Sequence, residues 1–356
     1  MNKNVLNKKF KELKMDAIIS QAPQTRLWYS EIQTTDGYII IEPNKAYLFV
    51  DGRYIEYCQN NAKNVEIHLL AKGTLQSFLN EKKYKNVALE KDYLIYEDYL
   101  SIKNMLKLEE KNIQWINGQE LRIYKSLDEV AKLQKAIDIS LSAYEELMTK
   151  IKEGQNEKEV ASLLNYIMKQ KGAEKEGFDE IVAAGSSSAE PHHHPVENKK
   201  VQKGELLKID YGAQYLGFTA DITRTCIFGG EDKVNNPEAL KILNIVKAAA
   251  KAGRDAVKPG IKASEIDKIC RDYISKAGYE KFFLHGTGHG LGIDVHELPY
   301  VRSTSDYILE PGMVITVEPG IYIEGLGGAR IEDDVLVVKQ GRYVFSRKDE
   351  RDPLEV

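Results

Sequence analysis

The sequence predicts two domains, a small α/β domain followed by a larger α+β domain. The chain has 356 residues, which is more than a single hydrophobic core usually supports. Up to residue 118, short apolar runs suited to strands alternate with helical stretches. From residue 126 onward, long amphipathic helices are mixed with strand pairs joined by tight turns. This second pattern is typical of an α+β domain and not of a doubly wound sheet.

The first domain is expected to span residues 1–118. Its first element should be an amphipathic helix, because Val5, Leu6, Phe10 and Leu13 recur at helical spacing. Short apolar runs predict strands at residues 17–19, 37–41, 46–50, 88–90 and 113–116. Asn117-Gly118 is a turn signal and marks the expected domain boundary.

The second domain is expected to span residues 126–356. Ser126 and Glu129 have the spacing of a capping box, and a long amphipathic helix follows them and ends near Gly154. Further helices are predicted at residues 157–171, 237–257 and 264–277. The remaining segments read as strands and loops.

Composition and charge argue against several classes of protein. The net charge of −4 disfavours a nucleic-acid-binding protein, and no apolar run reaches the 18 or so residues that span a bilayer. The three cysteines are widely separated and form no CxxC pair, so neither a disulfide framework nor a thiolate zinc site is predicted. The basic N-terminus lacks the apolar segment of a signal peptide. We therefore expect a cytoplasmic protein that binds neither nucleic acid nor membrane.

Two predicted hairpins each carry a pair of acidic residues. Residues 206–212 and 218–228 read as neighbouring strands, and a turn centred between Tyr215 and Leu216 would place Asp210 opposite Asp221. Residues 314–318 and 330–338 read as a second pair, and a turn centred on Gly325 would place Glu318 opposite Glu332. Like charges directly opposed on a sheet are destabilising unless a positive group lies between them.

A glycine-rich segment supplies a histidine that could complete such a site. The stretch HGTGHGLG at residues 285–292 places His289 in backbone that tolerates close approach to a ligand, and His296 follows seven residues later. Four carboxylates and one imidazole form an oxygen-rich ligand set that suits Mn²⁺ or a similar divalent ion. The set is large enough for two ions side by side, as in two-metal hydrolases.

Plainer interpretations exist for the same residues. A single buried aspartate in a strand is more often a hydrogen-bonded structural residue, although two opposed acids need a partner. Histidines 192–194 are also compatible with an exposed polar loop, and Arg302 with a solvated surface charge. The glycines of residues 286–292 do not form a dinucleotide-binding loop, because Leu291 stands where that motif requires glycine.

Four stretches resemble the metallopeptidases of the pita-bread fold, a family that includes methionine aminopeptidases, aminopeptidase P and prolidase. They are LKIDYGAQYLGFTADITRT, HGTGHGLGIDVHE, EPGMVITVEPGIY and GGARIEDDVLV, and the resemblance covers about residues 126–356. LFVDGRYIEYC at residues 48–58 is similar to the N-terminal domain of aminopeptidase P and prolidase. Methionine aminopeptidases lack that domain, so the resemblance implies the proline-specific branch.

The resemblance also implies roles for individual residues. It implies that Asp210, Asp221, His289, Glu318 and Glu332 bind two divalent ions, with Mn²⁺ expected and Co²⁺ or Zn²⁺ as alternatives. Glu318 would carry a proton from the nucleophile to the departing proline nitrogen. His296 would contact the scissile carbonyl, as would the histidine 17 residues before Asp210, which is His193, with His192 as the alternative. Arg330 would support the ligands, and Arg302 would bind a substrate carboxylate.

The implied activity is hydrolysis of the bond before a proline in the second position of a peptide, by a homodimer. Aminopeptidase P, which removes one residue from longer chains, is the preferred interpretation, and prolidase, which cleaves dipeptides, is the alternative. A metal-free pita-bread protein that only binds peptides or a partner protein is a third interpretation. The complete ligand set disfavours that interpretation, and it disfavours a metal-free creatinase-like enzyme for the same reason.

Overall fold

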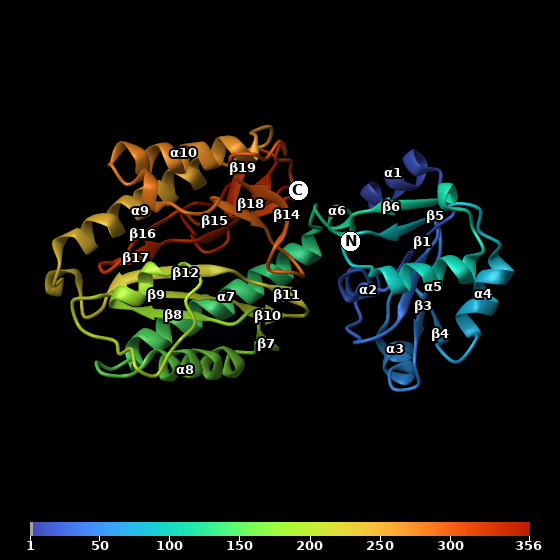
Figure 1. Ribbon diagram of the computed structural model, residues 1–356, viewed down its shortest axis with the longest axis horizontal. Helices are drawn as coiled ribbons and strands as arrows, with labels where there is room; N and C mark the ends of the chain where they lie inside the picture. Colours follow the sequence, from blue (N-terminus) through green and yellow to red (C-terminus); the bar gives the residue numbers. More distant parts are fainter. Residues whose placement is uncertain (1–2) are drawn as a thin grey trace. The chain divides into compact units, whose positions relative to one another are not determined.

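The computed structural model describes residues 3–356. The chain divides into two compact units, one ending at Arg122 and the other beginning at Ile123 (Figure 1). No helix in the described part of the chain is both long enough and apolar enough to cross a bilayer.

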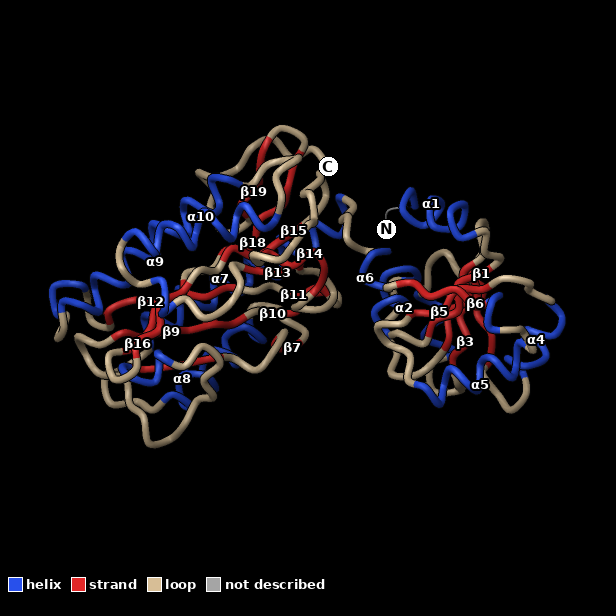
Figure 2. Tube along the Cα trace, turned by 45° about the horizontal axis from the view of Figure 1, so that its top comes forward, coloured by secondary structure: helices blue, strands red, loops and turns tan. Residues whose placement is uncertain are grey.

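The smaller unit is built on one mixed sheet with strand order β4-β3-β2-β1-β5-β6. The pairs β1–β2 and β2–β3 are antiparallel, and the other pairs are parallel. Figure 2 shows these strands at the centre of the unit with helices around them. The strands are β1 (Ala17–Ser20), β2 (Tyr38–Ile41), β3 (Ala46–Val50), β4 (Glu66–Leu69), β5 (Val87–Glu90) and β6 (Ile113–Ile116). The helices are α1 (Lys3–Leu13), α2 (Pro23–Ser30), α3 (Ile55–Asn61), α4 (Thr74–Lys82), α5 (Tyr96–Leu106), the 3₁₀ turn η1 (Glu110–Asn112) and α6 (Gly118–Leu121).

The strands predicted for this unit are all present, but strand β4 was not predicted. Glu66 and His68 interrupt its apolar pattern, and β4 lies at the edge of the sheet, where its side chains stay partly exposed. An edge strand buries little apolar surface, so its sequence carries only a weak hydrophobic signal.

The larger unit contains the long helices that the sequence predicts. The helix expected after Ser126 is α7 (Leu127–Lys150), and Glu129 accepts a hydrogen bond from the Ser126 backbone N–H at 2.8 Å. The other helices are α8 (Glu157–Gln170), α9 (Pro237–Ala256), α10 (Ala263–Lys276) and the 3₁₀ turns η2 (Gly185–Ala189), η3 (Glu231–Lys233) and η4 (Glu280–Phe282). In Figure 1, α9 and α10 lie on one side of the strands, and α8 lies on the other.

The strands of the larger unit form several small antiparallel sheets. Their orders are β11-β10-β7, β12-β9-β8, β14-β13-β15-β18-β19 and β16-β17. The strands are β7 (Lys175–Glu176), β8 (Ile181–Ala184), β9 (Leu206–Tyr211), β10 (Ala213–Tyr215), β11 (Phe218–Thr219), β12 (Ile222–Ile227), β13 (Gly288–Gly290), β14 (Glu297–Val301), β15 (Val314–Val317), β16 (Gly320–Ile323), β17 (Gly327–Arg330), β18 (Asp333–Val338) and β19 (Gly341–Val344). One apolar core joins α9 and α10 to β15, β17 and β18.

The predicted register of the first hairpin is wrong by two residues. Asp210 pairs with Thr223, and the same register places Asp221 opposite Gly212. The cause is the turn, because Leu216 and Gly217 both have positive φ angles, of 47° and 76°, and form a two-residue loop between Tyr215 and Phe218. A shift of two residues keeps each side chain on its predicted face.

The predicted register of the second hairpin is confirmed. Val317 pairs with Asp333 on one side of the two glutamates, and Gly320 pairs with Arg330 on the other side. Both pairs have the register that places Glu318 opposite Glu332. The turn is centred on Gly325, which has a φ of 79°. Pro319 lies in the interruption between β15 and β16, where proline costs no ladder hydrogen bond.

Candidate active site

Three of the four candidate carboxylates lie at interruptions of strand pairing. Asp221 lies between β11 and β12, Glu318 between β15 and β16, and Glu332 between β17 and β18. At each interruption the chain leaves one small sheet and enters another. An interrupted ladder can re-aim a side chain that regular alternation would direct elsewhere.

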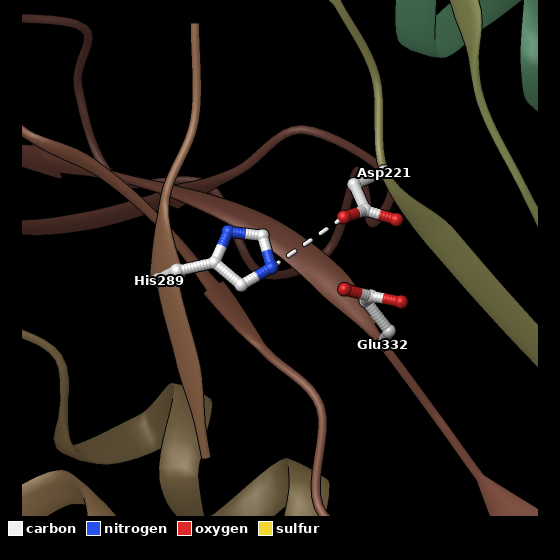
Figure 3. Close-up of side chains that lie close together, drawn as sticks. All are labelled: Asp221, His289 and Glu332. Atoms are coloured by element: carbon white, nitrogen blue, oxygen red, sulfur yellow. Dashed lines mark ion pairs between the residues drawn. The ribbon is translucent and has the colours of Figure 1, made fainter. Parts of the chain in front are cut away.

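These interruptions bring the side chains from both hairpins together around His289. Its Nε2 atom lies 3.2 Å from Glu318 Oε1 and 3.6 Å from Asp221 Oδ2. Candidate ligand atoms of Asp221, His289 and Glu332 all lie within 4.8 Å of one another. Figure 3 shows both of the drawn carboxylates on the side of the ring that carries Nε2.

Asp210, the fifth candidate ligand, lies beside Arg330. The Arg330 guanidinium donates to the Asp210 carboxylate, to Thr223 Oγ1 at 3.0 Å and to the Tyr322 hydroxyl at 2.8 Å. Arg330 is buried, so these contacts fix it in one orientation. The supporting role of Arg330 stays a prediction, and its contact with Asp210 is the feature that such a role requires.

The acidic side chains strongly affect one another's ionisation. Burial, followed by the charges of neighbouring carboxylates, raises the pKa of Asp221 and of Glu332 well above their ordinary values. Burial would also raise the pKa of Glu318, but the hydrogen bond and charge of His289 outweigh it and lower that pKa to about 2. A set of carboxylates this close is stable in its ionised form only with added positive charge.

The donor atoms fit a divalent metal ion. Within residues 3–356, Asp210 Oδ1 and Glu332 Oε1 are buried and have no hydrogen-bond partner. Buried polar atoms are normally satisfied, so these two oxygens point to a missing positive partner. Carboxylate oxygens together with one imidazole nitrogen are the ligands that Mn²⁺ and similar ions accept.

A cavity of about 410 Å³ opens onto these ligand candidates. Its wall also contains the remaining residues that the sequence singled out, and all of its lining belongs to the larger unit. Those residues are His192, His193, His296, Arg302 and Arg330. Further lining residues include Phe178, His285 and Tyr300.

The histidines around the cavity have different surroundings. The His296 ring lies 4.3 Å from the His289 ring, centroid to centroid, and burial followed by the charge of His289 lowers the pKa of His296. His193 is buried between two carboxylates, with Nε2 2.7 Å from Glu157 and Nδ1 2.6 Å from Glu190. His192 is exposed to the cavity, and its charge contributes to lowering the pKa of His285 and of His296.

Sequence reasoning missed two buried residues beside the cavity, Glu157 and Lys208. Both are completely buried, and both contact the segment that carries the three histidines. Lys208 had a signal, because it is the one charged residue before Asp210 in the apolar run Leu206-Leu207-Lys208-Ile209. Glu157 had none, because a glutamate at the start of a helix is ordinary.

Comparison with known proteins places the chain in a family. Residues 131–339 match the metallopeptidase family M24, and residues 4–130 match the creatinase/prolidase N-terminal domain. The chain belongs to metallopeptidase family M24. The predicted pita-bread fold, with a smaller N-terminal domain before the M24 domain, is confirmed, and so is the prediction of a metallopeptidase.

Relatives of this M24 protein include Xaa-Pro dipeptidases and an X-Pro aminopeptidase. The Xaa-Pro dipeptidase of Pyrococcus furiosus is 36% identical over 305 residues, covering 86% of this chain and 85% of its own. An Xaa-Pro dipeptidase structure from Bacillus anthracis has a TM-score of 0.90 at 34% identity and covers 99% and 98% of the two chains. An X-Pro aminopeptidase structure from Thermotoga maritima has a TM-score of 0.87 at 31% identity, covering 98% and 99%.

Glu180, close to the cavity wall, gives a pH-dependent prediction for this M24 protein. Burial, followed by the charges of Glu176 and Asp179, raises the pKa of Glu180 from 4.5 to about 7. The folded protein therefore holds this proton more tightly than the unfolded chain, and the stability it contributes is lost as pH rises through about 7. Glu180→Gln should raise Tm at pH 8 by about 5 °C, since the shift is worth no more than about 3 kcal/mol.

At pH 5 the same substitution should raise Tm by less than about 2 °C, because the folded carboxyl is still protonated and only the unfolded carboxyl, with its ordinary pKa of 4.5, has begun to ionise. Glu145→Gln, on the exposed side of α7, is the matched control and should show no pH-dependent difference. Calorimetry at both pH values measures the effect, and an equal Tm change at pH 5 and pH 8 would contradict it.

Proposed function

We propose that this M24 protein hydrolyses the Xaa-Pro bond and releases the N-terminal residue from peptides that have proline in the second position. The observation that carries the proposal is the buried group of carboxylates around His289, which includes two unpartnered oxygens and lines a cavity of about 410 Å³. The names of the relatives support the bond specificity. The Xaa-Pro dipeptidase activity is the second candidate.

We propose that two divalent ions, Mn²⁺ in the first place and Co²⁺ or Zn²⁺ as alternatives, bind at this group. The residues that would hold them are Asp210, Asp221, His289, Glu318 and Glu332. When bound, such ions supply a Lewis acid for the scissile carbonyl and make water a stronger acid. The unpartnered oxygens of Asp210 and Glu332 support this assignment.

Glu318 is proposed as the group that moves the proton. Its low pKa keeps it ionised at neutral pH, so it can accept a proton from the attacking water. The nitrogen of an Xaa-Pro bond carries no hydrogen, and it must gain a proton before proline can leave. Glu318 would deliver that proton, and the Thr316 hydroxyl, which donates to Glu318 Oε1 at 3.1 Å, would hold its carboxylate in place.

Two histidines are proposed to bind the carbonyl oxygen as negative charge develops on it. His296 lines the cavity beside His289, and its lowered pKa keeps it neutral with one N–H to donate. The second donor is His193 or His192. Both ring nitrogens of His193 already face carboxylates, whereas His192 is exposed to the cavity, so the contacts favour His192.

Arg302 is proposed to bind a substrate carboxylate. It is exposed in the cavity wall, and its guanidinium lies 4.9 Å from the centre of the Tyr300 ring. In an Xaa-Pro dipeptide the carboxylate belongs to the proline itself and stays next to the scissile bond. Arg302 is therefore the specific observation that favours the dipeptidase candidate.

One assay separates the two activities. The metal-free chain is reconstituted with Mn²⁺, and an Xaa-Pro dipeptide is compared with a longer peptide that begins Xaa-Pro-Pro. Rapid release of the first residue from the longer peptide supports the aminopeptidase, and cleavage of the dipeptide alone supports the dipeptidase. Absence of cleavage of both peptides would refute the proposal.

Assembly and location complete the proposal. We propose a homodimer, by analogy with the family, and a cytoplasmic location, which the three free cysteines Cys58, Cys226 and Cys270 support. Sedimentation of the purified protein tests the proposed homodimer, and a monomer at micromolar concentration would contradict it.

A further inference from the structure

The histidine-bearing segment from Glu190 to Val196 contains three consecutive histidines in an irregular loop. The proposed function needs only one of them at the scissile carbonyl, and the following inference rests on that function. A loop without strand or helix pairing must be fixed by other contacts if one side chain is to stay in place. Two completely buried charged residues, Lys208 and Glu157, supply those contacts.

Lys208 holds the start of the histidine-bearing segment. Its ammonium donates to the backbone carbonyl oxygens of Ser188 at 3.0 Å and Glu190 at 2.6 Å, and it lies 3.5 Å from that of Pro191. Arg330 donates to the same Pro191 carbonyl at 3.2 Å. A buried lysine is costly unless its donors are satisfied, and backbone carbonyls of this segment satisfy them.

Glu157 holds the end of the same segment. It is the first residue of α8, and its Oε2 atom accepts from the Val196 backbone N–H at 3.1 Å and lies 2.7 Å from His193 Nε2. Its other oxygen accepts from the Ala184 backbone N–H at 2.9 Å, which ties the carboxylate to β8. The His193 ring is thereby held between two carboxylates, with Nε2 facing Glu157 and Nδ1 facing Glu190.

These contacts leave His192 between two fixed points. The Pro191 carbonyl precedes it and the clamped His193 ring follows it, so the backbone on both sides of His192 is held. His192 is exposed and lines the cavity together with His285 and His296. Of the three histidines, His193 is the buried one, whereas His192 and His194 are both exposed and line the cavity, and His192 is the one that directly follows the anchored Pro191 carbonyl.

We propose that Lys208 and Glu157 are positioning residues that fix the histidine-bearing segment so that His192 meets the substrate carbonyl, while His193 is structural. The hydrogen bonds described above join Lys208 and Glu157 to the segment, to Ser188 and to β8, and not to a candidate metal ligand. Their effect on catalysis passes through His192. That dependence distinguishes a positioning role from a general contribution to stability.

The test is a double-mutant cycle on the full-length, Mn²⁺-loaded enzyme, with Lys208→Met, His192→Ala and the double variant. Each single variant should lower kcat on an Xaa-Pro substrate at least tenfold with KM changed less than threefold and metal content unchanged. The double variant should be no slower than His192→Ala alone, because Lys208 acts through that histidine. Lys199→Met is the control and should match the wild type, because Lys199 is an exposed lysine that lies just after the segment in the sequence.

Hydrogen exchange of residues 188–196 gives a readout that does not depend on activity. It should become faster in Lys208→Met and stay unchanged in Lys199→Met, with or without Mn²⁺. If the wild type fails to cleave Xaa-Pro bonds, the proposed function is wrong while the exchange result still tests the anchoring of the segment. If Lys208→Met does not fold, Glu157→Gln replaces it in both measurements with the same expectations.

Three results would overturn the inference. The first is that the losses of kcat add up in the double variant. The second is that hydrogen exchange of the segment is unchanged in both Lys208→Met and Glu157→Gln. The third is that His192→Ala is fully active while His193→Ala is inactive although its segment exchanges like that of the wild type.

Discussion

Glu318→Ala should abolish turnover of Xaa-Pro substrates, the largest effect on activity that we expect. The substitution removes both a candidate ligand and the group proposed to carry the proton. Glu318→Gln separates the two contributions, because glutamine keeps an oxygen beside His289 but cannot carry a proton. General acid–base catalysis contributes about 10²- to 10⁴-fold, so a fall in kcat of about 10³-fold is expected for glutamine.

Stopped-time product assays on protein of measured metal content test this expectation. Glu324→Gln is the matched control, because Glu324 lies exposed near the tip of the same hairpin and outside the cavity lining. It should leave kcat and metal content unchanged. Near-normal activity of Glu318→Gln would remove Glu318 from the proton pathway, even if the residue still binds metal.

Asp333→Asn should produce the largest loss of stability. Asp333 is completely buried and ion-paired with Arg224 at 2.8 Å, Arg254 at 3.0 Å and Arg347 at 2.8 Å. Burial would raise the pKa of Asp333, but the three arginines outweigh it and lower that pKa to about 2. Removing one partner of a buried ion pair costs about 3–5 kcal/mol, because the remaining charges stay buried without compensation.

The expected fall in Tm is about 10 °C at pH 7, measured by calorimetry. A depressed pKa contributes stability that is present above the ordinary value of 3.8 and is lost as pH falls through about 2, so the variant and the wild type should converge in strong acid. Asp255→Asn is the control. The Asp255 side chain is 41% exposed and forms an ion pair with Arg342, so the substitution should lower the free energy of unfolding by less than about 1 kcal/mol. A Tm loss for Asp333→Asn as small as the control's would contradict the argument.

The two hairpins show what sequence could predict and where it failed. In the second hairpin, Gly325 lies at the centre of a glycine-rich turn, and that centre determined the register correctly. In the first hairpin, the loop depends on a positive φ at Leu216, which leucine rarely adopts and its sequence does not signal. The predicted opposition of Asp210 and Asp221 failed for that reason, although their shared face survived the two-residue shift.

The surroundings of the histidines were beyond sequence reasoning for a different reason. Counting residues back from Asp210 selected His193, but adjacent residues in a loop can point in opposite directions. The partners that clamp His193 come from the start of α8 and from Glu190, and only the folded chain brings them together. Residue type and spacing therefore predicted the candidate ligands, whereas the loop depended on contacts between distant segments.

The interrupted strand pairing at Asp221, Glu318 and Glu332 also bears on how the protein can change over evolution. Each acid lies at the junction of two small sheets and is separated by a strand from the hairpin tip at Leu216-Gly217 or Gly325. A longer hairpin tip adds residues beyond the junction, at the end of the hairpin, so the three acids can keep their positions. Deleting a single residue at a junction would instead turn an acid out of the cluster. Natural variation in chain length should therefore accumulate at the tips, and the junctions should keep a constant spacing.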